Sequence, residues 1–368
     1  MKIEAAVTRA PHAPMSLEKL DLADLRDDEI RVRLVATGIC HTDIVMRDQM
    51  YPVPQPVVLG HEGAGVVEAV GHAVTKVKPG DHVAMSFDSC GVCPSCEARI
   101  PNYCHDFFGR NFAGLRPDGT SALSQNGTLI HGHFFGQSSF ASHSICHERN
   151  IVLVPSDVPL DILGPLGCGI QTGAGSIINA LKVGFGQSLV VFGTGSVGLS
   201  AVMAARAVGA GTIVAVDRVA ARLAMAKELG ATAVVDVTAT NDLVGEVKRL
   251  TGGGAHFTFE TTGLAPVVRQ ALDVLAPRGV CGYVGAAAPG TEVSIDLTEM
   301  MTSGKTLHGI VEGEANPDIF IPAMIDLYRQ GRFPFDRLIT FYPFERINDA
   351  IRDSETAKVI KPVVRMPA

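Results

Sequence analysis

The sequence lacks any run of like charges, and its 368 residues carry a net charge of −7. This pattern argues against nucleic acid or an anionic membrane as a partner. Long apolar runs are also missing, because glycines and polar residues interrupt the two uncharged stretches, 164–181 and 188–205. A membrane-spanning helix needs about 20 consecutive apolar residues, so we interpret both stretches as buried segments. The N-terminus, Met-Lys-Ile-Glu-Ala-Ala-Val, has an acid and no long apolar core, and we expect no signal peptide.

Cysteine is scarce outside one short segment. The chain has eight cysteines, and half of them are Cys90, Cys93, Cys96 and Cys104. Because no other region is rich in cysteine, a disulfide framework is disfavoured; free buried thiols are the other alternative. Four thiolates at this spacing can surround one zinc ion and leave no open position for a substrate, which predicts a structural zinc site. Thiolate zinc ligands and the lack of a targeting segment favour the cytoplasm.

A chain of this length is expected to form two domains. In residues 1–168, short apolar runs separated by turn signals predict an all-β core, with strands near 30–35, 57–59, 65–70 and 82–86. From about 187 to 310, strand-like runs alternate with helical ones, which predicts an α/β fold with a doubly wound, six-stranded parallel sheet. The tail, 312–368, returns to short mixed elements, and we expect it to rejoin the first domain.

A glycine-rich turn follows the first strand of the second region. The segment Gly-Thr-Gly-Ser-Val-Gly begins at Gly193 and leads into an apolar helix. In this context Gly193 allows the tight turn, Gly195 lets the backbone approach a pyrophosphate, and Gly198 lets the helix pack on the sheet. Asp217 follows the next strand, where an acid accepts hydrogen bonds from the adenosine ribose and repels a 2′-phosphate. This predicts NAD rather than NADP, although Arg218 could pair with a 2′-phosphate.

Two further cysteines and a histidine form a second candidate metal site. Cys40 lies in Gly-Ile-Cys-His-Thr-Asp, His61 in Gly-His-Glu-Gly, and Cys168 in Gly-Cys-Gly. A lone histidine beside a strand is more often structural. Two thiolates and one imidazole, however, would leave zinc a fourth position for water or substrate, which is typical of catalytic zinc. Cys146 and Cys281 have no such setting, and we interpret them as ordinary buried thiols.

These features together resemble the zinc-containing medium-chain alcohol dehydrogenases over essentially the whole chain. The likeness is greatest to the bacterial aryl- and allylic-alcohol branch, of the benzyl-alcohol dehydrogenase type. The resemblance implies a GroES-like catalytic domain at 1–168 and 312–368, with a structural zinc lobe at about 88–106. It implies a Rossmann NAD-binding domain at 169–311, two zinc ions per chain, and assembly as a homodimer or homotetramer.

The resemblance also assigns roles around the catalytic zinc, whose ligands are Cys40, His61 and Cys168. Asp43 holds the second ring nitrogen of His61 and so fixes its tautomer. Glu62 lies behind the metal as a transient ligand or field-tuning acid, and Thr42 hydrogen-bonds the alcohol oxygen. The family often has a histidine where this chain has Val45, which cannot titrate. The proton must therefore leave Thr42 through a cofactor ribose hydroxyl or another base.

Cofactor contacts follow from the same resemblance. Thr172 and Val197 pack on the two sides of the nicotinamide, and Val284 and Ala286 bind its carboxamide through their backbone. The remaining contacts are assigned to His41, Arg222 and Lys361, and Lys361 is expected to hold the pyrophosphate. Many members have Arg where this chain has His41, and a histidine holds phosphate less firmly than an arginine.

Three aromatic residues, Phe87, Phe134 and Phe135, map near the zinc, with Val311 on the far wall of the substrate channel. Plain core packing is the other interpretation of the aromatics. A flat, apolar channel favours a primary aromatic or allylic alcohol, oxidised reversibly to the aldehyde with hydride transfer to NAD. The alternatives in this fold are a thiol-adduct reaction of the formaldehyde type and oxidation of a secondary or polyol alcohol. A non-catalytic binding protein would be expected to lack the zinc ligands or the glycine turn.

Overall fold

The computed structural model describes residues 1–367 and divides into two compact units. The first comprises Met1–Cys168, Asn316–Ala323 and Leu338–Ala368, and the second comprises Gly169–Ala315 and Met324–Arg337. The sequence had been expected to return to the first domain at 312 and to stay there. The structure differs, because the division falls inside helix α10 (Pro317–Arg329), directly after Pro322 and Ala323, and the rest of that helix belongs to the second unit.

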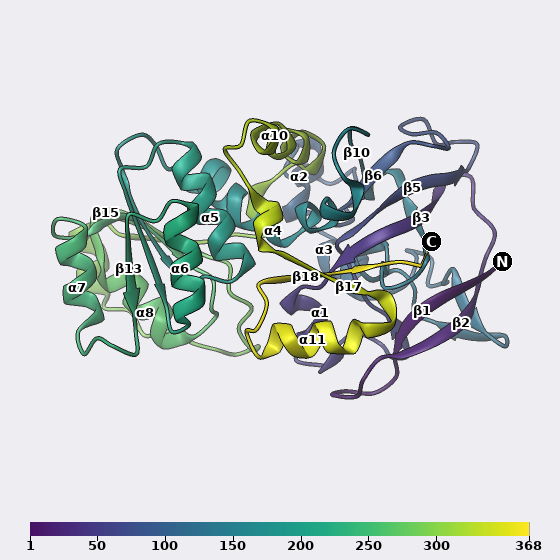
Figure 1. The fold of residues 1–368 in the computed structure, drawn as a ribbon, viewed down its shortest axis with the longest axis horizontal. Helices are drawn as coiled ribbons and strands as arrows, with labels where there is room; N and C mark the ends of the chain where they lie inside the picture. The colour runs from purple at the N-terminus through teal and green to yellow at the C-terminus, as the bar shows by residue number, and fades with distance from the viewer. Residues whose placement is uncertain (368) are drawn as a thin grey trace. The chain divides into compact units, whose positions relative to one another are not determined.

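Two mainly antiparallel sheets build the first unit (Figure 1). The smaller has the order β4-β1-β2-β7-β8, and the larger has β10-β6-β5-β3-β18-β17 with β9 also paired to β3. The smaller sheet contains β1 (Lys2–Thr8), β2 (Ser16–Leu22), β4 (Val57–Val58), β7 (Leu123–Gln125) and β8 (Thr128–Ile130). The larger contains β3 (Glu29–Gly38), β5 (Gly63–Val70), β6 (His82–Met85), β9 (His143–His147), β10 (Ile151–Leu153), β17 (Ile339–Pro343) and β18 (Lys361–Arg365). This is the expected β-rich domain.

Strand β3 is the centre of the larger sheet because its apolar residues alternate along the chain. Ile30, Val32 and Leu34 are buried on one face, as a half-covered strand requires. Its partner β18 comes from the C-terminal segment and pairs with it antiparallel, as Figure 1 shows. The helices of this unit are short: α1 (His41–Arg47), α2 (Pro94–Glu97), α3 (Phe107–Phe112), α11 (Ile347–Glu355), η1 (Pro101–Tyr103), η2 (Phe134–Gly136), η3 (Glu148–Asn150), η4 (Leu160–Ile162), η5 (Gly164–Gly167) and η9 (Phe344–Arg346).

The second unit contains a six-stranded parallel sheet of order β13-β12-β11-β14-β15-β16. Its strands are β11 (Ser188–Phe192), β12 (Thr212–Asp217), β13 (Ala233–Asp236), β14 (Ala255–Glu260), β15 (Leu275–Tyr283) and β16 (Thr306–Gly309). Its helices are α4 (Gly169–Gly175), η6 (Ser176–Ala180), α5 (Ser196–Ala207), α6 (Ala220–Leu229), α7 (Leu243–Leu250), α8 (Ala265–Asp273), α9 (Leu297–Ser303), η7 (Glu312–Glu314) and η8 (Phe335–Leu338). Every residue of β11 is buried, as expected for a parallel strand covered on both faces. The doubly wound sheet is confirmed, and its order reverses between β11 and β14.

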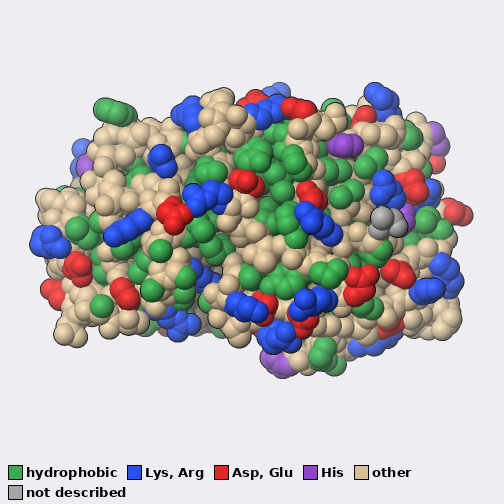
Figure 2. Space-filling view, viewed as in Figure 1, with side chains coloured by type: hydrophobic (Ala, Val, Ile, Leu, Met, Phe, Trp, Pro, Cys, Tyr) green, Lys and Arg blue, Asp and Glu red, His purple; other side chains and the backbone are tan. Residues whose placement is uncertain are grey.

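Charged side chains of both signs are mixed across the face that Figure 2 shows. Within residues 1–367, no helix is both long enough and apolar enough to cross a membrane.

One buried histidine of the first unit couples folding to pH. His133 is 6% exposed, and its Nε2 atom accepts a hydrogen bond from the backbone N–H of Ala122 at 3.2 Å. Burial lowers the pKa of His133 from 6.5 to about 3, and the positive charges of Arg116 and Arg26 add to this shift. The folded state therefore binds a proton at His133 less tightly than the unfolded state does, and protonation of this residue favours unfolding. The free energy of unfolding is not reduced by His133 above pH 6.5, and it decreases as the pH falls from 6.5 toward 3.

Replacing His133 by Gln, which keeps an acceptor but cannot titrate, should remove that pH dependence. At pH 5 the wild type should have lost about 2 kcal/mol of unfolding free energy through this group, and the variant should not. The melting temperatures of both proteins between pH 8 and pH 5 test this. The gap between them should shift in favour of the variant as the solution is acidified, and parallel curves would show that His133 titrates normally.

Candidate active site and metal centres

The first unit brings Cys40, His61, Glu62 and Cys168 together. One ligand atom from each of these residues lies within 4.8 Å of the ligand atoms of the others. Cys40 is the N-cap of α1, the adjacent pair His61 and Glu62 directly precedes β5, and Cys168 follows η5. The chain can approach so closely at Cys168 because Gly167 has no side chain: a Cβ there would lie 1.9 Å from the carbonyl oxygen of Met85. Three segments far apart in sequence therefore supply two sulfurs, one imidazole and one carboxylate.

Asp43 organises this cluster from behind. Its Oδ1 atom lies 2.8 Å from His61 Nδ1 and accepts from the Gly60 N–H, while its Oδ2 accepts from the Cys40 N–H at 2.9 Å. With Nδ1 facing a carboxylate, His61 presents Nε2 to the cluster. That atom is buried and has no hydrogen-bond partner. A buried polar atom in this state needs a partner, and a metal ion held by Cys40, His61 and Cys168 would be one. The residues present therefore fit the expected zinc.

Thr42 and Val45 lie on helix α1 beside the cluster. The hydroxyl oxygen of Thr42 is 3.7 Å from the sulfur of Cys40, so it is next to a metal ligand, as its expected role requires. Val45 is 4% exposed and packs in the hydrophobic core. His41, the first residue of the helix, is exposed and lines a cavity of about 490 Å³ with His12 and Asp48. Its contact with the cofactor pyrophosphate stays a prediction.

Glu62 and Lys361 form a buried ion pair. The ammonium of Lys361 donates to the two carboxylate oxygens of Glu62 at 2.8 and 2.9 Å and to the carbonyl of Ile39 at 3.3 Å. The Lys361 side chain is 1% exposed and that of Glu62 is 0% exposed. The expectation that Lys361 holds the cofactor pyrophosphate was therefore wrong. As the first residue of β18, Lys361 is carried into the interior by the pairing of that strand with β3.

Charge in this pair is set by burial and by the neighbouring sulfurs. Burial raises the pKa of Glu62 to about 7, while the Lys361 ammonium opposes the shift. For Lys361, burial alone would lower the pKa, but the Glu62 carboxylate and Cys40 outweigh it, and the pKa is raised. Lys361 therefore remains positive and offsets part of the negative charge that two thiolates and a carboxylate bring to the site.

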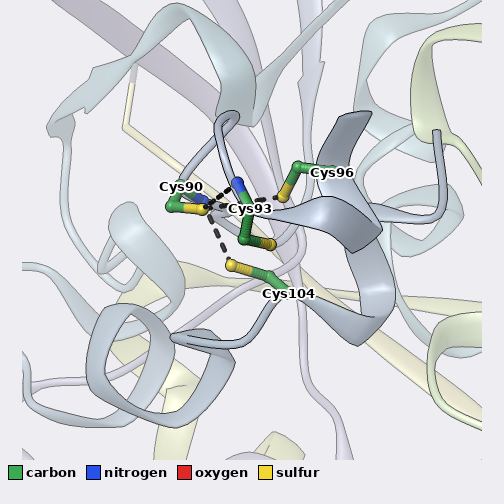
Figure 3. Close-up of side chains that lie close together, drawn as sticks. All are labelled: Cys90, Cys93, Cys96 and Cys104. Atoms are coloured by element: carbon green, nitrogen blue, oxygen red, sulfur yellow. Dashed lines mark hydrogen bonds between the residues drawn. The ribbon is translucent and has the colours of Figure 1, made fainter. Parts of the chain in front are cut away.

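The second group of metal-binding residues is the four-cysteine lobe. Cys90, Cys93, Cys96 and Cys104 converge with their sulfurs within 4.8 Å of one another (Figure 3). The backbone N–H groups of Cys93 and Val92 donate to the sulfur of Cys90, at 3.2 and 3.5 Å. The N–H of Cys90 donates to the sulfur of Cys104 at 3.2 Å. Hydrogen bonds from N–H groups stabilise thiolates. Four thiolate ligands leave zinc no open position for a substrate, so the lobe fits a structural zinc ion.

Aromatic side chains surround the imidazole of His61. The ring of Phe135 stacks on it with centroids 4.5 Å apart, and the ring of Phe134 meets it edge-on at 5.6 Å. Phe134 is fully buried, while Phe87 and Phe135 are 3% and 4% exposed, and all three belong to the core of the first unit. Core packing is therefore the correct interpretation of Phe134, whose ring has no exposed face for a substrate. Val311 belongs to the second unit and is 36% exposed.

The glycine turn of the second unit has the features of a dinucleotide site. Gly193 directly follows β11 and has a φ of +87°, and a Cβ on Gly198 would lie 1.9 Å from the carbonyl oxygen of Gly193. A Cβ on Gly195 would meet no atom within 4 Å, so the space that a pyrophosphate needs lies over this residue, at the N-terminus of α5. The carboxylate of Asp217 accepts from the Thr194 N–H at 2.6 Å and from its hydroxyl at 2.7 Å. The acid therefore lies beside the turn, where an adenosine ribose is expected.

Other expected cofactor residues lie around this turn. Thr172 is on α4, which packs against α5 so closely that a Cβ on Gly173 would lie 2.1 Å from the carbonyl oxygen of Val197. Arg222 is in the first turn of α6 after Asp217, and its Nε atom is buried without a hydrogen-bond partner. Val284 and Ala286 follow β15, and the Val284 N–H donates to the carbonyl of Glu260 at 3.0 Å. A carboxamide bound there would therefore use backbone groups other than that N–H.

Sequence reasoning missed two residues that the fold brings to these sites. Thr194 was treated only as a spacer between glycines, although its side chain bonds Asp217. Glu312 was overlooked altogether, although it is 8% exposed and contacts Thr172. The available signal for Glu312 was its place in the sequence, because it comes shortly after the last strand of the parallel series, at the edge where ligands bind in such sheets.

Comparison with known proteins agrees with this geometry. Residues 26–156 match the family described as "Alcohol dehydrogenase GroES-like domain", and residues 196–329 match the one described as "Zinc-binding dehydrogenase". The chain is 48% identical over 362 residues to the geraniol dehydrogenase of Castellaniella defragrans. The aligned region covers 98% of this chain and 97% of that protein.

Two solved structures resemble the fold over 100% of both chains. They are the alcohol dehydrogenase zinc-binding domain protein from Burkholderia ambifaria, with a TM-score of 0.98 and 50% identity, and the benzyl alcohol dehydrogenase from Acinetobacter calcoaceticus, with a TM-score of 0.96 and 46% identity. With both domains matched, and with a relative this similar along nearly its whole length, the chain belongs to the zinc-containing medium-chain alcohol dehydrogenase family.

Proposed function

We propose that this protein oxidises primary aromatic or allylic alcohols to the aldehydes, reversibly, with NAD as the hydride acceptor. The observation that carries the proposal is the environment of His61. Its Nε2 atom points to two cysteine sulfurs, while its ring is covered by Phe135. The aromatic rings packed around His61 keep the surroundings of the metal position apolar, which suits an apolar alcohol. Relatives named geraniol dehydrogenase and benzyl alcohol dehydrogenase act on alcohols of this kind, which supports the same substrate class here.

Residues of this chain have distinct parts in the proposed reaction. When bound, zinc favours loss of the alcohol proton and NAD accepts the hydride. Asp43 keeps the His61 ring oriented toward the metal position. Thr42 lies next to Cys40, where its hydroxyl can hydrogen-bond the alcohol oxygen and take up its proton. Val45 cannot continue this path, so the proton leaves Thr42 by way of a cofactor hydroxyl or water.

A panel of alcohols assayed with NAD and with NADP tests the proposal. We expect kcat/KM for benzyl alcohol and geraniol to exceed that for short aliphatic and secondary alcohols by at least about tenfold, which is about 1.4 kcal/mol of transition-state binding. Formaldehyde supplied with a thiol belongs in the same panel. If the thiol adduct or a polyol gave the highest kcat/KM, the proposed substrate class would be wrong.

Exchanging Asp217 should alter the choice of cofactor. In Asp217→Ser the charge that would face a 2′-phosphate is lost, so the ratio of kcat/KM with NADP to that with NAD should rise by roughly tenfold or more. Because Asp217 also bonds Thr194, Asp217→Asn is the matched control: it removes the charge but keeps an acceptor. Both variants should move the ratio in the same direction. An unchanged ratio in both would mean that Asp217 does not contact the ribose.

A further inference from the structure

An unusual turn follows the last strand of the parallel sheet. After β16, residues Glu312, Gly313 and Glu314 all have positive φ, at 50°, 66° and 48°. This conformation is uncommon and unfavourable for residues other than glycine, and it persists only where surrounding contacts enforce it. The turn is pressed against α4: a Cβ on Gly313 would lie 2.5 Å from the carbonyl oxygen of Gln171, and one on Gly175 would lie 2.4 Å from the Gly313 oxygen.

The two glutamates of this turn have different surroundings. Glu314 pairs with His308, whose Nε2 atom lies 2.8 Å from its carboxylate, and the side chain of Glu314 is 23% exposed. Glu312 is instead 8% exposed and faces α4, where its Oε2 atom accepts from the Gln171 amide at 3.1 Å and lies 3.4 Å from the Thr172 hydroxyl. Burying a carboxylate costs free energy unless hydrogen bonds compensate for the lost hydration. The hydrogen bonds from Gln171 and Thr172 therefore stabilise the Glu312 carboxylate in its buried position against α4.

The sheet order locates this contact relative to a dinucleotide. Gly193 and Asp217 mark the carboxyl ends of β11 and β12, on the adenosine side of the point where the order reverses. The other half of the cofactor is expected over the carboxyl ends of β14, β15 and β16. Glu312 follows β16 after Ile310 and Val311, and the Ile310 N–H donates to the carbonyl of Tyr283 at the end of β15. Thr172 lies between this edge and the glycine turn, because α4 packs on α5 at Val197.

We propose that Glu312 is a positioning residue that holds Thr172 and Gln171 in place as the wall of the nicotinamide site, and so sets the affinity for the nicotinamide half of the cofactor. This inference rests on the proposed use of NAD. Glu312 acts through its two partners on α4 and leaves the adenosine half, at Asp217 and the glycine turn, unchanged.

Binding of two ligands that share the adenosine half separates this role from a general structural one. The dissociation constants of NADH and of ADP-ribose, which lacks the nicotinamide, are measured by titration calorimetry for the wild type and three variants. Glu312→Ala should weaken NADH binding about tenfold and leave ADP-ribose binding within about twofold. Glu312→Gln keeps acceptors for Gln171 and Thr172 and should restore most of the NADH affinity. Glu314→Ala, at the same kind of backbone position, should leave both ligands unaffected.

The outcomes distinguish the inference from the function on which it rests. Equal weakening of both ligands by Glu312→Ala, or weakening of neither, would overturn the positioning role. The same holds if Glu314→Ala reproduced the effect, since the turn and not the carboxylate would then be responsible. A wild-type protein that bound neither ligand would instead overturn the use of NAD itself. If Glu312→Ala fails to fold, a fourth variant, Gln171→Ala, decides, because it removes one of the two hydrogen bonds to the Glu312 carboxylate. The positioning role requires Gln171→Ala to weaken NADH binding more than ADP-ribose binding, while Glu312→Gln keeps most of the wild-type affinity for both ligands. Equal effects of Gln171→Ala on both ligands, or none on either, would overturn the role.

Discussion

Cys168→Ala abolishes alcohol oxidation while the fold and cofactor binding remain: this is the largest effect that we expect on activity. Cys168 is one of three residues whose ligand atoms converge on the unpartnered Nε2 of His61. With one thiolate removed, the remaining ligands cannot hold a zinc ion in a catalytic geometry. We expect kcat to fall by more than about a thousandfold, which corresponds to about 4 kcal/mol. Assays of alcohol oxidation, circular dichroism and NADH binding on the same preparation measure the three quantities.

Cys146→Ala is the matched control for that variant. Cys146 is also buried, at 2% exposed, but it lies in β9 and takes part in neither cysteine cluster. It should lose little activity, so a large loss in Cys168→Ala cannot be ascribed to removal of any buried thiol. If Cys168→Ala kept more than about a tenth of the wild-type kcat, or failed to fold, the assignment of Cys168 to the catalytic site would be wrong.

Cys96→Ala should have the opposite effect, with a large loss of stability. The four-cysteine lobe has little apolar burial of its own: no residue of α2 is buried, and Val92 and Phe108 are 76% and 71% exposed. A segment of this kind depends on its metal, because the free energy of zinc binding is also free energy of folding. Loss of several kcal/mol should lower the melting temperature by about 10 °C or more and reduce the yield of soluble protein.

Activity of the Cys96→Ala protein should fall only with the amount of folded protein. The lobe is separate from the cluster at His61, so the molecules that remain folded keep their catalytic ligands. Melting curves and active-site titration with NADH compare the folded fraction with the activity. A stable, soluble Cys96→Ala variant without alcohol oxidation would contradict the division of the two metal sites.

The four-cysteine metal site was predictable because its signal is local in sequence. Cys90, Cys93, Cys96 and Cys104 lie within one short segment, and the structure brings their sulfurs together as expected. The six parallel strands were equally predictable, since a strand such as β11 has an apolar run from Leu189 to Phe192 that is followed by a glycine turn. In each of these cases the chemistry depends on neighbours along the chain.

Contacts between distant segments could not be obtained in this way. Lys361 was expected to face the cofactor. Its strand, β18, instead pairs with β3 from the other end of the sequence, and this pairing places the Lys361 ammonium against Glu62. Phe134 was expected in a channel, and only the packing of η2 against His61 shows that it is core. Glu312 lies far along the chain from Thr172, so no spacing rule pairs them. A sequence pattern predicts whether a side chain is buried or exposed, but it does not predict which residue from a distant segment will contact that side chain.

Zinc content tests the central claim most directly. We expect metal analysis of the purified wild type to give about two zinc ions per chain, and of folded Cys168→Ala to give about one, with no detectable alcohol oxidation by the variant. This result would place one zinc ion at Cys40, His61 and Cys168, and assign the activity to it. A wild-type protein that oxidised alcohols with one zinc ion per chain or none would contradict the account.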